Sequence, residues 1–396
     1  MKILWIDVVS EMGGAQYSLL DACRKLVAYP DLEIAVALPH GPLFSHLSDA
    51  GITCFPIEPI RARRRGKGLF STLAKFFRAP SAIHKIIRAF RPDILHANAL
   101  PSLLTIRKER KIPIFWHVRD LRQPYPLFRE GAYLATRIIA ASQSIEEHLV
   151  ESVSSKTFSR IKLVRNGIDT DRYVPRDNRA ARDRFGLPQD VPLVGMVAHF
   201  IPWKRHDLFL ETAALVHARI PEAHFVLAGQ DLFHENAAYI NTLHKQAETL
   251  GIADRVHFIG DCQATETLFP AFTVLLHPPV GEPFGRVICE ALACQVPVVA
   301  AASAGPEEII AGTNSQAGNT GHPGILCERK TPEDFADAVC KLIEEPQTRT
   351  QMGTMGRQVV CERYSISRVA EELHKLYQTT LHEIAEDLRR ATNSDS

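Results

Sequence analysis

Residues 273–302 read TVLLHPPVGEPFGRVICEALACQVPVVAAA, in which two apolar runs flank a loop and a helical stretch. The run Thr273–His277 is typical of a buried strand, and it ends at Pro278. A helix is expected to begin near Gly285, and a second buried strand is expected over Val296–Ala302. Continuous apolar strands that alternate with helices are typical of parallel sheets covered on both faces. This stretch therefore predicts an α/β fold.

The same alternation extends through the whole chain. We expect further strands over the runs Ile3–Val9, Glu33–Leu38, Asp93–Ala97, Pro113–Val118, Arg137–Ala141, Ile161–Val164, Leu193–Ala198, His224–Ala228 and Val256–Ile259. In a chain of 396 residues, two doubly wound sheets fit so many strands better than one, because single cores stop growing at about 250–300 residues. The turn Arg165–Asp169 and the polar residues after it set the boundary. We therefore predict two Rossmann-like domains, residues 1–172 and 173–365.

Composition excludes several classes of protein. Hydrophobic residues make up 45% and charged residues 23%, which is ordinary for a globular chain. The net charge of only +1 argues against a nucleic-acid-binding protein. No run of about 18 apolar residues is present, and the N-terminus lacks a secretory signal. The eight cysteines are scattered, so we interpret them as small buried hydrophobes in a reducing, cytoplasmic compartment, with no metal site.

Open parallel sheets bind ligands beyond the carboxyl ends of their strands, so glycine and charged residues in the turns there indicate candidate binding sites. Gly13 and Gly14 follow the first strand, where glycine lets the backbone approach a ligand; a plain tight turn is the alternative. The turn is not the GxGxxG dinucleotide fingerprint, which disfavours an oxidoreductase. Lys204 and Arg205 follow the strand Leu193–Ala198 and suit a pyrophosphate. A solvated helix start remains the alternative for both cations.

The loop and helix after Thr273–His277 are the most informative turn. A helix that begins near Gly285 offers backbone N–H groups around Phe284 to Val287 for phosphate oxygens. Glu290 falls in its second turn, where a carboxylate can accept hydrogen bonds from a ribose, and Glu282 lies beyond the helix tip, where the attached sugar would be. Alternatively, Glu282 only complements the helix dipole and Glu290 is a surface residue.

Glu282 and Glu290, with seven residues between them and Pro-Phe-Gly after the first, resemble the E-x7-E motif of the retaining glycosyltransferase family 4. The similarity covers nearly the whole chain. Its other motifs are the glycine loop Gly13–Ala15, the strand Arg91–His96, the turn Arg165–Asp169 followed by Tyr173, the segment Gly305–Glu308 and the segment Arg363–Ile366. The resemblance implies a GT-B fold in which two domains face each other across a cleft. It also implies that a C-terminal helix, about 366–390, returns to the first, acceptor-binding domain.

The resemblance also assigns roles to individual residues. Glu282 would contact the donor sugar and Glu290 the ribose of a nucleotide diphosphate sugar. Phe284, Gly285, Arg286 and Val287 would form the loop and helix start that bind sugar and phosphate. Lys204 would neutralise the pyrophosphate, with Arg205 beside it, and Gly14 would approach from the other domain. His117, at the end of the strand Pro113–Val118, matches the histidine that faces the donor sugar, although a satisfied strand-end histidine is the alternative.

One position departs from the family pattern. The family usually has arginine five residues before the lysine, where this chain has His199. Histidine is mostly neutral at pH 7 and lacks the guanidinium fork, so a weaker phosphate clamp is expected.

The implied reaction is metal-independent glycosyl transfer with retention, in which the nucleotide sugar is the donor substrate and no cofactor is needed. The acceptor would be a glycan or a lipid-linked molecule, in bacterial polysaccharide or glycolipid synthesis. Two alternatives stay open. A GT-B-like sugar-nucleotide epimerase shares the architecture, and His199 leaves room for a non-catalytic nucleotide-sugar-binding subunit.

The segment between Pro59 and Pro92 contains ten lysines and arginines and no acid. Apolar residues recur in it at helical spacing, which suits an amphipathic surface that meets anionic lipid at the inner face of the cell membrane, or a lipid-linked acceptor. The residues assigned to this surface are Arg63, Arg64, Arg65, Lys67, Phe76 and Phe77. The alternative is a pair of ordinary helices with their apolar faces packed on the sheet.

Overall fold

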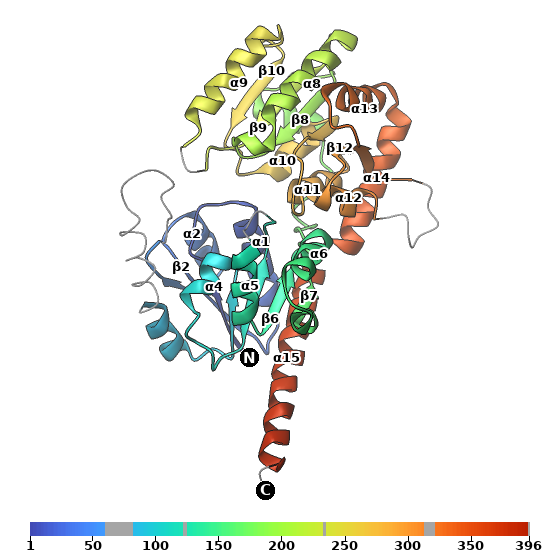
Figure 1. The fold of residues 1–396 in the computed structure, drawn as a ribbon. Coiled ribbons are helices and arrows are strands. Elements are labelled where there is room, and N and C mark those ends of the chain that lie inside the picture. The colour runs from blue at the N-terminus through green and yellow to red at the C-terminus, as the bar shows by residue number, and fades with distance from the viewer. Residues whose placement is uncertain (60–81, 122–124, 233–234, 313–320, 395–396) are drawn as a thin grey trace. The chain divides into compact units, whose positions relative to one another are not determined.

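The computed structural model describes residues 1–59, 82–121, 125–232, 235–312 and 321–394. The chain divides into two compact units, the first formed by Met1–Asn166 with Ile366–Ser396 and the second by Gly167–Ser365. Each unit has its own parallel β-sheet between helices (Figure 1). The α/β class predicted from the sequence is therefore confirmed.

The first unit contains a seven-stranded sheet in the order β3-β2-β1-β4-β5-β6-β7. Its strands are β1 (Lys2–Ile6), β2 (Glu33–Leu38), β3 (Thr53–Pro56), β4 (Ile94–Ala97), β5 (Ile114–Val118), β6 (Arg137–Ala140) and β7 (Ile161–Leu163). Its helices are α1 (Gly14–Leu26), α2 (Pro42–Asp49), residues 82–90, α4 (Leu100–Thr105), α5 (Tyr125–Leu134), α6 (Gln143–Ser152), the 3-10 helix η1 (Ser155–Arg160) and α15 (Ile366–Ser394).

The second unit contains a six-stranded sheet in the order β10-β9-β8-β11-β12-β13. Its strands are β8 (Leu193–Val197), β9 (His224–Ala228), β10 (Val256–Gly260), β11 (Val274–His277), β12 (Val298–Ala301) and β13 (Gly324–Cys327). Its helices are α7 (Asn178–Phe185), η2 (Pro202–Lys204), α8 (His206–Arg219), α9 (Ala237–Thr249), α10 (Thr265–Leu268), η3 (Phe269–Ala271), α11 (Arg286–Ala293), α12 (Ala304–Ile310), α13 (Pro332–Glu344) and α14 (Pro346–Arg363).

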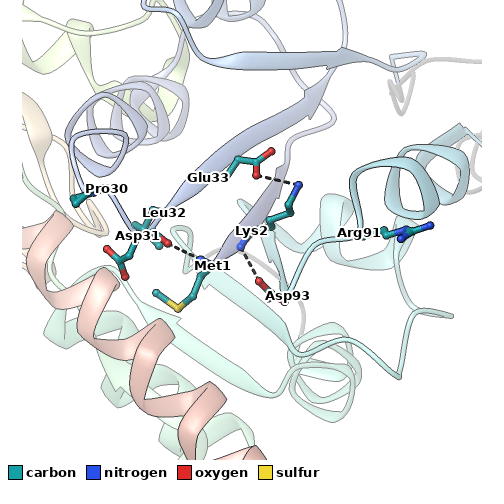
Figure 2. Close-up of a pocket in the computed structure, with 8 residues that line it drawn as sticks. All are labelled: Met1, Lys2, Pro30, Asp31, Leu32, Glu33, Arg91 and Asp93. Atoms are coloured by element: carbon teal, nitrogen blue, oxygen red, sulfur yellow. Dashed lines mark hydrogen bonds and ion pairs between the residues drawn. The ribbon is translucent and has the colours of Figure 1, made fainter.

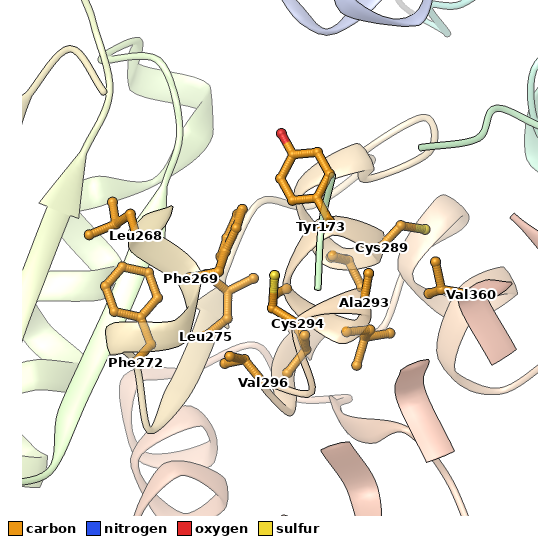
Figure 3. Packing of buried hydrophobic residues seen from close by; sticks show 14 of the residues in the cluster. Tyr173, Leu268, Phe269, Phe272, Leu275, Cys289, Ala293, Cys294, Val296 and Val360 are labelled. Atoms are coloured by element: carbon orange, nitrogen blue, oxygen red, sulfur yellow. The ribbon is translucent and has the colours of Figure 1, made fainter. Parts of the chain in front are cut away.

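Each sheet has an apolar core on both faces. In β1, Leu4 and Ile6 belong to one buried cluster and Ile3 and Trp5 to another, as the alternation of side chains along a strand requires. α15 contributes to the second cluster, in which Tyr377 is fully buried. In the second unit, the cluster around Tyr173, Phe269 and Phe272 packs α11 and α14 against one face of the sheet (Figure 3). Burial on both faces explains why the strands are continuous apolar runs.

The division between the units differs from the boundary expected at residue 172. The structure places it between Asn166 and Gly167. The N–H of Ile168 donates to the carbonyl of Tyr364 at 2.9 Å, and Arg172 forms an ion pair with Glu266 at 2.8 Å. These contacts hold residues 167–172 in the second unit. In the folded chain the division therefore falls within the turn Arg165–Asp169.

Two strands were missed in the sequence, and both lie at sheet edges. β3 is half exposed and ends at Pro56, which suits an edge because proline lacks a backbone donor. β13 lies at the edge of the second sheet, and its two middle residues, Ile325 and Leu326, are only half-buried. Neither strand is buried along its whole length as the central strands are.

Most of the basic segment lies outside the described residues, including Arg63, Arg64, Arg65, Lys67, Phe76 and Phe77. Only its last part, the helix over residues 82–90, can be compared with the two interpretations. There Ile83, Ile87 and Phe90 are buried in the core, and Lys85 and Arg88 are exposed. In this helix the apolar face packs on the sheet. Over the described residues, no helix combines the length and the apolarity needed to cross a membrane.

Candidate active site

Both sheets are wound outward in two directions from a central pair of strands, β1 and β4 in the first unit and β8 and β11 in the second. At such a switch point the connecting helices diverge, and ligands bind beyond the carboxyl ends of the two strands. Residues at these strand ends are therefore the first candidates for chemistry in each unit.

In the second unit, Glu282 and Lys204 form a buried ion pair beyond the switch point. Lys204 ends η2, which follows β8, and Glu282 lies in the loop after β11. Their side chains are only 13% and 12% exposed. The structure thus brings together two residues that the sequence analysis had selected from two different turns.

His277, the last residue of β11, completes this cluster. Its Nε2 lies 3.5 Å from the Glu282 carboxylate, and its side chain is buried. Burial by itself would raise the pKa of Glu282, but the charge of Lys204 and the contact with His277 outweigh it and hold that pKa well below its ordinary value. Burial lowers the pKa of His277, although Glu282 opposes the shift. Glu282 is thus ionised at neutral pH, and His277 was not recognised in the sequence as a site residue.

The loop from Glu282 to Gly285 is fixed by its packing. Phe284 is buried against Tyr364, with the ring centroids 5.7 Å apart. Gly305 donates its N–H to the carbonyl of Glu282 at 3.0 Å, and a Cβ on Gly305 would come within 2.2 Å of the Phe284 carbonyl oxygen. Gly285 has φ +91° and precedes α11, which begins at Arg286. The close approach at Gly305 and the positive φ at Gly285 therefore both require glycine.

The first turns of α11 contain the second acid of the motif. Glu290 is buried, and its carboxylate accepts a hydrogen bond from Arg286 Nε at 2.8 Å. Arg286 also donates to the carbonyl of Gly167 at 3.2 Å. Glu290 is therefore not a surface residue, which removes that alternative. The binding of phosphate by the helix start at Phe284–Val287 stays a prediction.

His199 and Arg205 differ in their surroundings. His199 is half-buried two residues after β8, and burial, with the nearby charge of Lys204, lowers its pKa. It is therefore neutral at pH 7 in the unliganded protein. Arg205 pairs with Asp207 at 3.1 Å and is 42% exposed. Of the two adjacent cations, only Lys204 contacts Glu282.

In the first unit, a polar network joins the ends of neighbouring strands. Asp7 follows β1 and accepts hydrogen bonds from Asn98 Nδ2 at 2.7 Å and Gln16 Nε2 at 3.1 Å. Asn98, which follows β4, accepts from Arg119 Nε at 2.9 Å, and Arg119 also donates to Asn166. Burial raises the pKa of Asp7, although these hydrogen bonds oppose it. Arg119 is thus the centre of the network.

His117 lies in β5 beside this network and is almost fully buried. Its Nδ1 faces Arg119 at 3.2 Å and His96 Nε2 at 3.3 Å. Burial, together with the charge of Arg119, lowers the pKa of His117 and of His96 well below the ordinary value. Its Nε2 is buried and has no hydrogen-bond partner among the described residues. His117, which the sequence analysis selected, therefore has one ring nitrogen, Nε2, that could still form a hydrogen bond to a ligand.

Gly14 begins α1 directly after the loop that follows β1. A Cβ on Gly14 would meet nothing within 4 Å. Packing among the described residues therefore does not require glycine at this position, and the approach of Gly14 to a ligand stays a prediction.

A pocket of about 480 Å³ lies at the opposite, amino end of the first sheet (Figure 2). It is lined by Met1, Lys2, Pro30, Asp31, Leu32, Glu33, Arg91 and Asp93. Lys2 pairs with Glu33 at 2.9 Å, and the backbone N–H of Lys2 donates to Asp93 at 2.8 Å. It contains none of the residues assigned from the sequence, and the amino ends of parallel strands are not where such folds bind substrates.

Comparison with known protein families agrees with these two units. A family model described as Glycosyltransferase Family 4 matches residues 12–172. A second, described as Glycosyl transferases group 1, matches residues 177–359. The chain belongs to the group 1, family 4 glycosyltransferases. The family resemblance that the motifs predicted is confirmed.

Curated relatives of this family 4 chain include D-inositol 3-phosphate glycosyltransferases. One from Catenulispora acidiphila is 33% identical over 226 residues, which make up 55% of this chain and 50% of the relative. Another from Stackebrandtia nassauensis is 30% identical over 277 residues, 65% of this chain and 60% of the relative. The match thus spans half to three fifths of these curated relatives.

Solved structures resemble the family 4 chain over nearly its whole length. HepE of Anabaena, in complex with UDP and glucose, has a TM-score of 0.79 at 23% identity and covers 96% of this chain and 99% of its own. Sucrose-phosphate synthase of Thermosynechococcus elongatus has a TM-score of 0.79 at 20% identity, with the same coverage of 96% and 99%. These likenesses show the GT-B fold.

Proposed function

We propose that this protein transfers a sugar from a nucleotide diphosphate to a hydroxyl group of an acceptor, with retention at the anomeric carbon. The observation that supports it most is the cluster of Lys204, Glu282 and His277 at the switch point of the second sheet. A buried carboxylate that stays ionised beside one lysine is a suitable environment for a reaction that separates a positive sugar from a negative diphosphate. Family membership supports the same reaction.

Each candidate site residue of the second unit has a proposed role. Lys204 neutralises the charge that develops on the departing diphosphate, and the N-terminal turn of α11 binds its oxygens. Glu290, which Arg286 holds in place at 2.8 Å, accepts hydrogen bonds from the ribose. Glu282 lies beside the reacting sugar. In the first unit, His117 hydrogen-bonds a hydroxyl of that sugar.

The proposed step involves two bonds at the anomeric carbon. The bond between that carbon and the phosphate oxygen breaks, and the acceptor oxygen bonds to the carbon on the same face. The acceptor's proton passes to the departing phosphate oxygen, so the products are a glycoside and a nucleoside diphosphate. No group in the described residues has been assigned as a nucleophile, and the protein contributes positioning and charge stabilisation.

The relatives suggest which substrates to test first. HepE was crystallised with UDP-glucose, and the curated relatives are named for D-inositol 3-phosphate. We propose a UDP-hexose as the donor class and a polyol or sugar hydroxyl as the acceptor. A thermal-shift panel of nucleotide sugars should single out the donor, because a ligand that binds only the native state raises the melting temperature.

Product analysis with that donor then tests the function. Incubation with an acceptor panel that includes D-inositol 3-phosphate should release nucleoside diphosphate and form a glycoside with the donor's anomeric configuration. Glu282→Gln should abolish both, whereas Glu248→Gln, on the exposed face of α9, should leave them unchanged. A nucleotide sugar that is converted to an epimer without an acceptor would contradict the proposal.

A further inference from the structure

A chain of three side chains leads from the C-terminal helix to His117. The hydroxyl of Tyr377, on α15, lies 2.6 Å from His96 Nδ1. His96 Nε2 lies 3.3 Å from His117 Nδ1. All three residues are almost fully buried, and all belong to the first unit. Trp5 stacks on His96 with the ring centroids 3.5 Å apart and the planes at 14°, which fixes the orientation of the His96 ring.

The contacts determine where each proton lies. A guanidinium only donates hydrogen bonds, so His117 Nδ1, at 3.2 Å from Arg119, must be an acceptor. A neutral imidazole has one N–H, and His117 therefore has its proton on Nε2. His96 Nε2 then donates to His117 Nδ1, which leaves His96 Nδ1 to accept the proton of the Tyr377 hydroxyl. One assignment of protons thus accommodates all three contacts, with the lone pair of His117 Nδ1 shared by the donors Arg119 and His96.

Electrostatics supports the neutral state that this assignment needs. Burial and the positive charge of Arg119 lower the pKa of both histidines well below the ordinary value. Burial raises the pKa of Tyr377 well above its ordinary value, so its hydroxyl keeps its proton. Asp7, the acid of the same network, accepts hydrogen bonds from the amides of Asn98 and Gln16.

We propose that His96 and Tyr377 are positioning residues that hold His117 as the Nε2–H tautomer, so that His117 donates a hydrogen bond to an oxygen of the bound sugar and does not act as a base. The proposal rests on the proposed function for the identity of the ligand. Its structural part rests only on the contacts of the first unit. The buried, unpartnered Nε2 of His117 is the donor that this arrangement leaves for a substrate.

The proposal gives the C-terminal helix a role in the site. α15 follows the second unit in sequence and packs into the core of the first, where Tyr377 reaches His96. His374, one turn earlier, contacts Tyr29 and Asp31 at the surface instead. Only Tyr377 among these α15 residues contacts the buried histidine.

Two-bond ¹⁵N–¹H spectra of the full chain labelled with [¹⁵N]histidine test the tautomer without any substrate. The His117→Gln and His96→Gln variants assign the two signals. We expect His117 to show a protonated Nε2 and an unprotonated Nδ1, unchanged between pH 6 and 8. A protonated Nδ1, or a doubly protonated ring at pH 7, would overturn the proposal.

Kinetics with the donor then tests the consequence. His96→Leu removes one hydrogen-bond donor to His117. It should lower kcat about tenfold, which corresponds to the loss of one hydrogen bond, with little change in KM. His96→Gln, whose amide can donate and accept in the same directions, should restore most of the rate. Tyr377→Phe should lower kcat about threefold and introduce the other tautomer into the His117 spectrum. Tyr29→Phe, at a half-buried tyrosine beside the same helix, is the matched control and should change neither.

The outcomes separate this inference from the proposed function. A fixed Nε2–H tautomer in a protein that transfers no sugar would refute the function and leave the positioning role standing. Transfer activity with a His117 that is protonated on Nδ1 would refute the positioning role alone. If His96→Leu does not fold, Tyr377→Phe decides, and wild-type kinetics and spectra in that variant would refute the proposal.

Discussion

Removal of the Lys204 charge is the most direct test of the second-unit site. Lys204 and Glu282 contact each other with 13% and 12% of their side chains exposed, and His277 Nε2 lies 3.5 Å from the same carboxylate. In Lys204→Met the carboxylate stays buried and loses its cation. Breaking a buried pair from one side costs about 3–5 kcal/mol, because an uncompensated charge remains. We expect a loss of about 3 kcal/mol in the free energy of unfolding at pH 7.5, since His277 retains part of the contact.

The loss should depend on pH in a definite direction. In the wild type the folded pKa of Glu282 lies below its unfolded value, so its contribution to stability is complete above the unfolded pKa of about 4.3 and is lost as the pH falls through the folded value. In Lys204→Met, burial is expected to raise the folded pKa above the unfolded one. The carboxylate then destabilises the variant at high pH and takes up a proton as the pH falls. The stability difference between the two proteins should therefore shrink from pH 7.5 to pH 5.

Urea unfolding at both pH values measures these differences. The double variant Lys204→Met/Glu282→Gln should lose about 2 kcal/mol less free energy of unfolding than the two single variants lose together. A coupling of this size is within the range for residues in contact. Arg179→Gln is the control, because its pair with Asp190 is about 70% exposed and should contribute less than about 1 kcal/mol. A loss in Lys204→Met as small as that of the control, with no pH dependence, would refute the buried pair.

Three further predictions concern ligands. Gly14→Ala should leave the melting temperature unchanged or slightly higher, because a Cβ there meets nothing, yet weaken donor affinity at least tenfold in titration calorimetry; unchanged affinity would place the diphosphate elsewhere. The affinity of the wild type for a nucleoside diphosphate should rise from pH 8 to pH 6, because the pKa of His199 is lowered in the free protein and a bound phosphate raises it, so that binding takes up a proton. His199→Arg should bind tightly at both pH values, and a pH-independent affinity in the wild type would contradict this. Glu290→Ala should mainly raise KM and Glu282→Ala mainly lower kcat, since a ribose contact is equal in ground and transition states; equal, small effects on initial rates would show that both are misplaced.

The sequence predicted those features that are determined locally. The strands buried on both faces were predicted because each is an uninterrupted apolar run. Glu282 and Lys204 were chosen because they follow strands of one parallel sheet, and the structure places them in contact. Glu290 was placed in the second turn of the helix after Gly285, and the structure shows it buried there.

Residues whose roles depend on distant partners were not predicted. Asp7 lay within the expected strand Ile3–Val9, whereas β1 ends at Ile6 and leaves Asp7 in the polar network. Arg119 was visible after a strand end, but nothing local showed that Asn98 and Asn166 would meet it. His277 is a residue of a buried strand, and only its 3.5 Å contact with Glu282 shows its part in the site.

The two units differ in how their chemistry is encoded. In the second unit, both acids of the motif lie in one loop and helix, where sequence spacing alone determines their relation. In the first unit, His117 depends on His96 in another strand and on Tyr377, which lies 281 residues beyond His96. α15 follows the second unit in sequence, yet it can bias the tautomer of His117, because Tyr377 contacts His96 and His96 contacts His117 within the buried core. The state of His117 is therefore a property of the folded core, and changes in α15 far from any ligand are expected to act on the reaction through it.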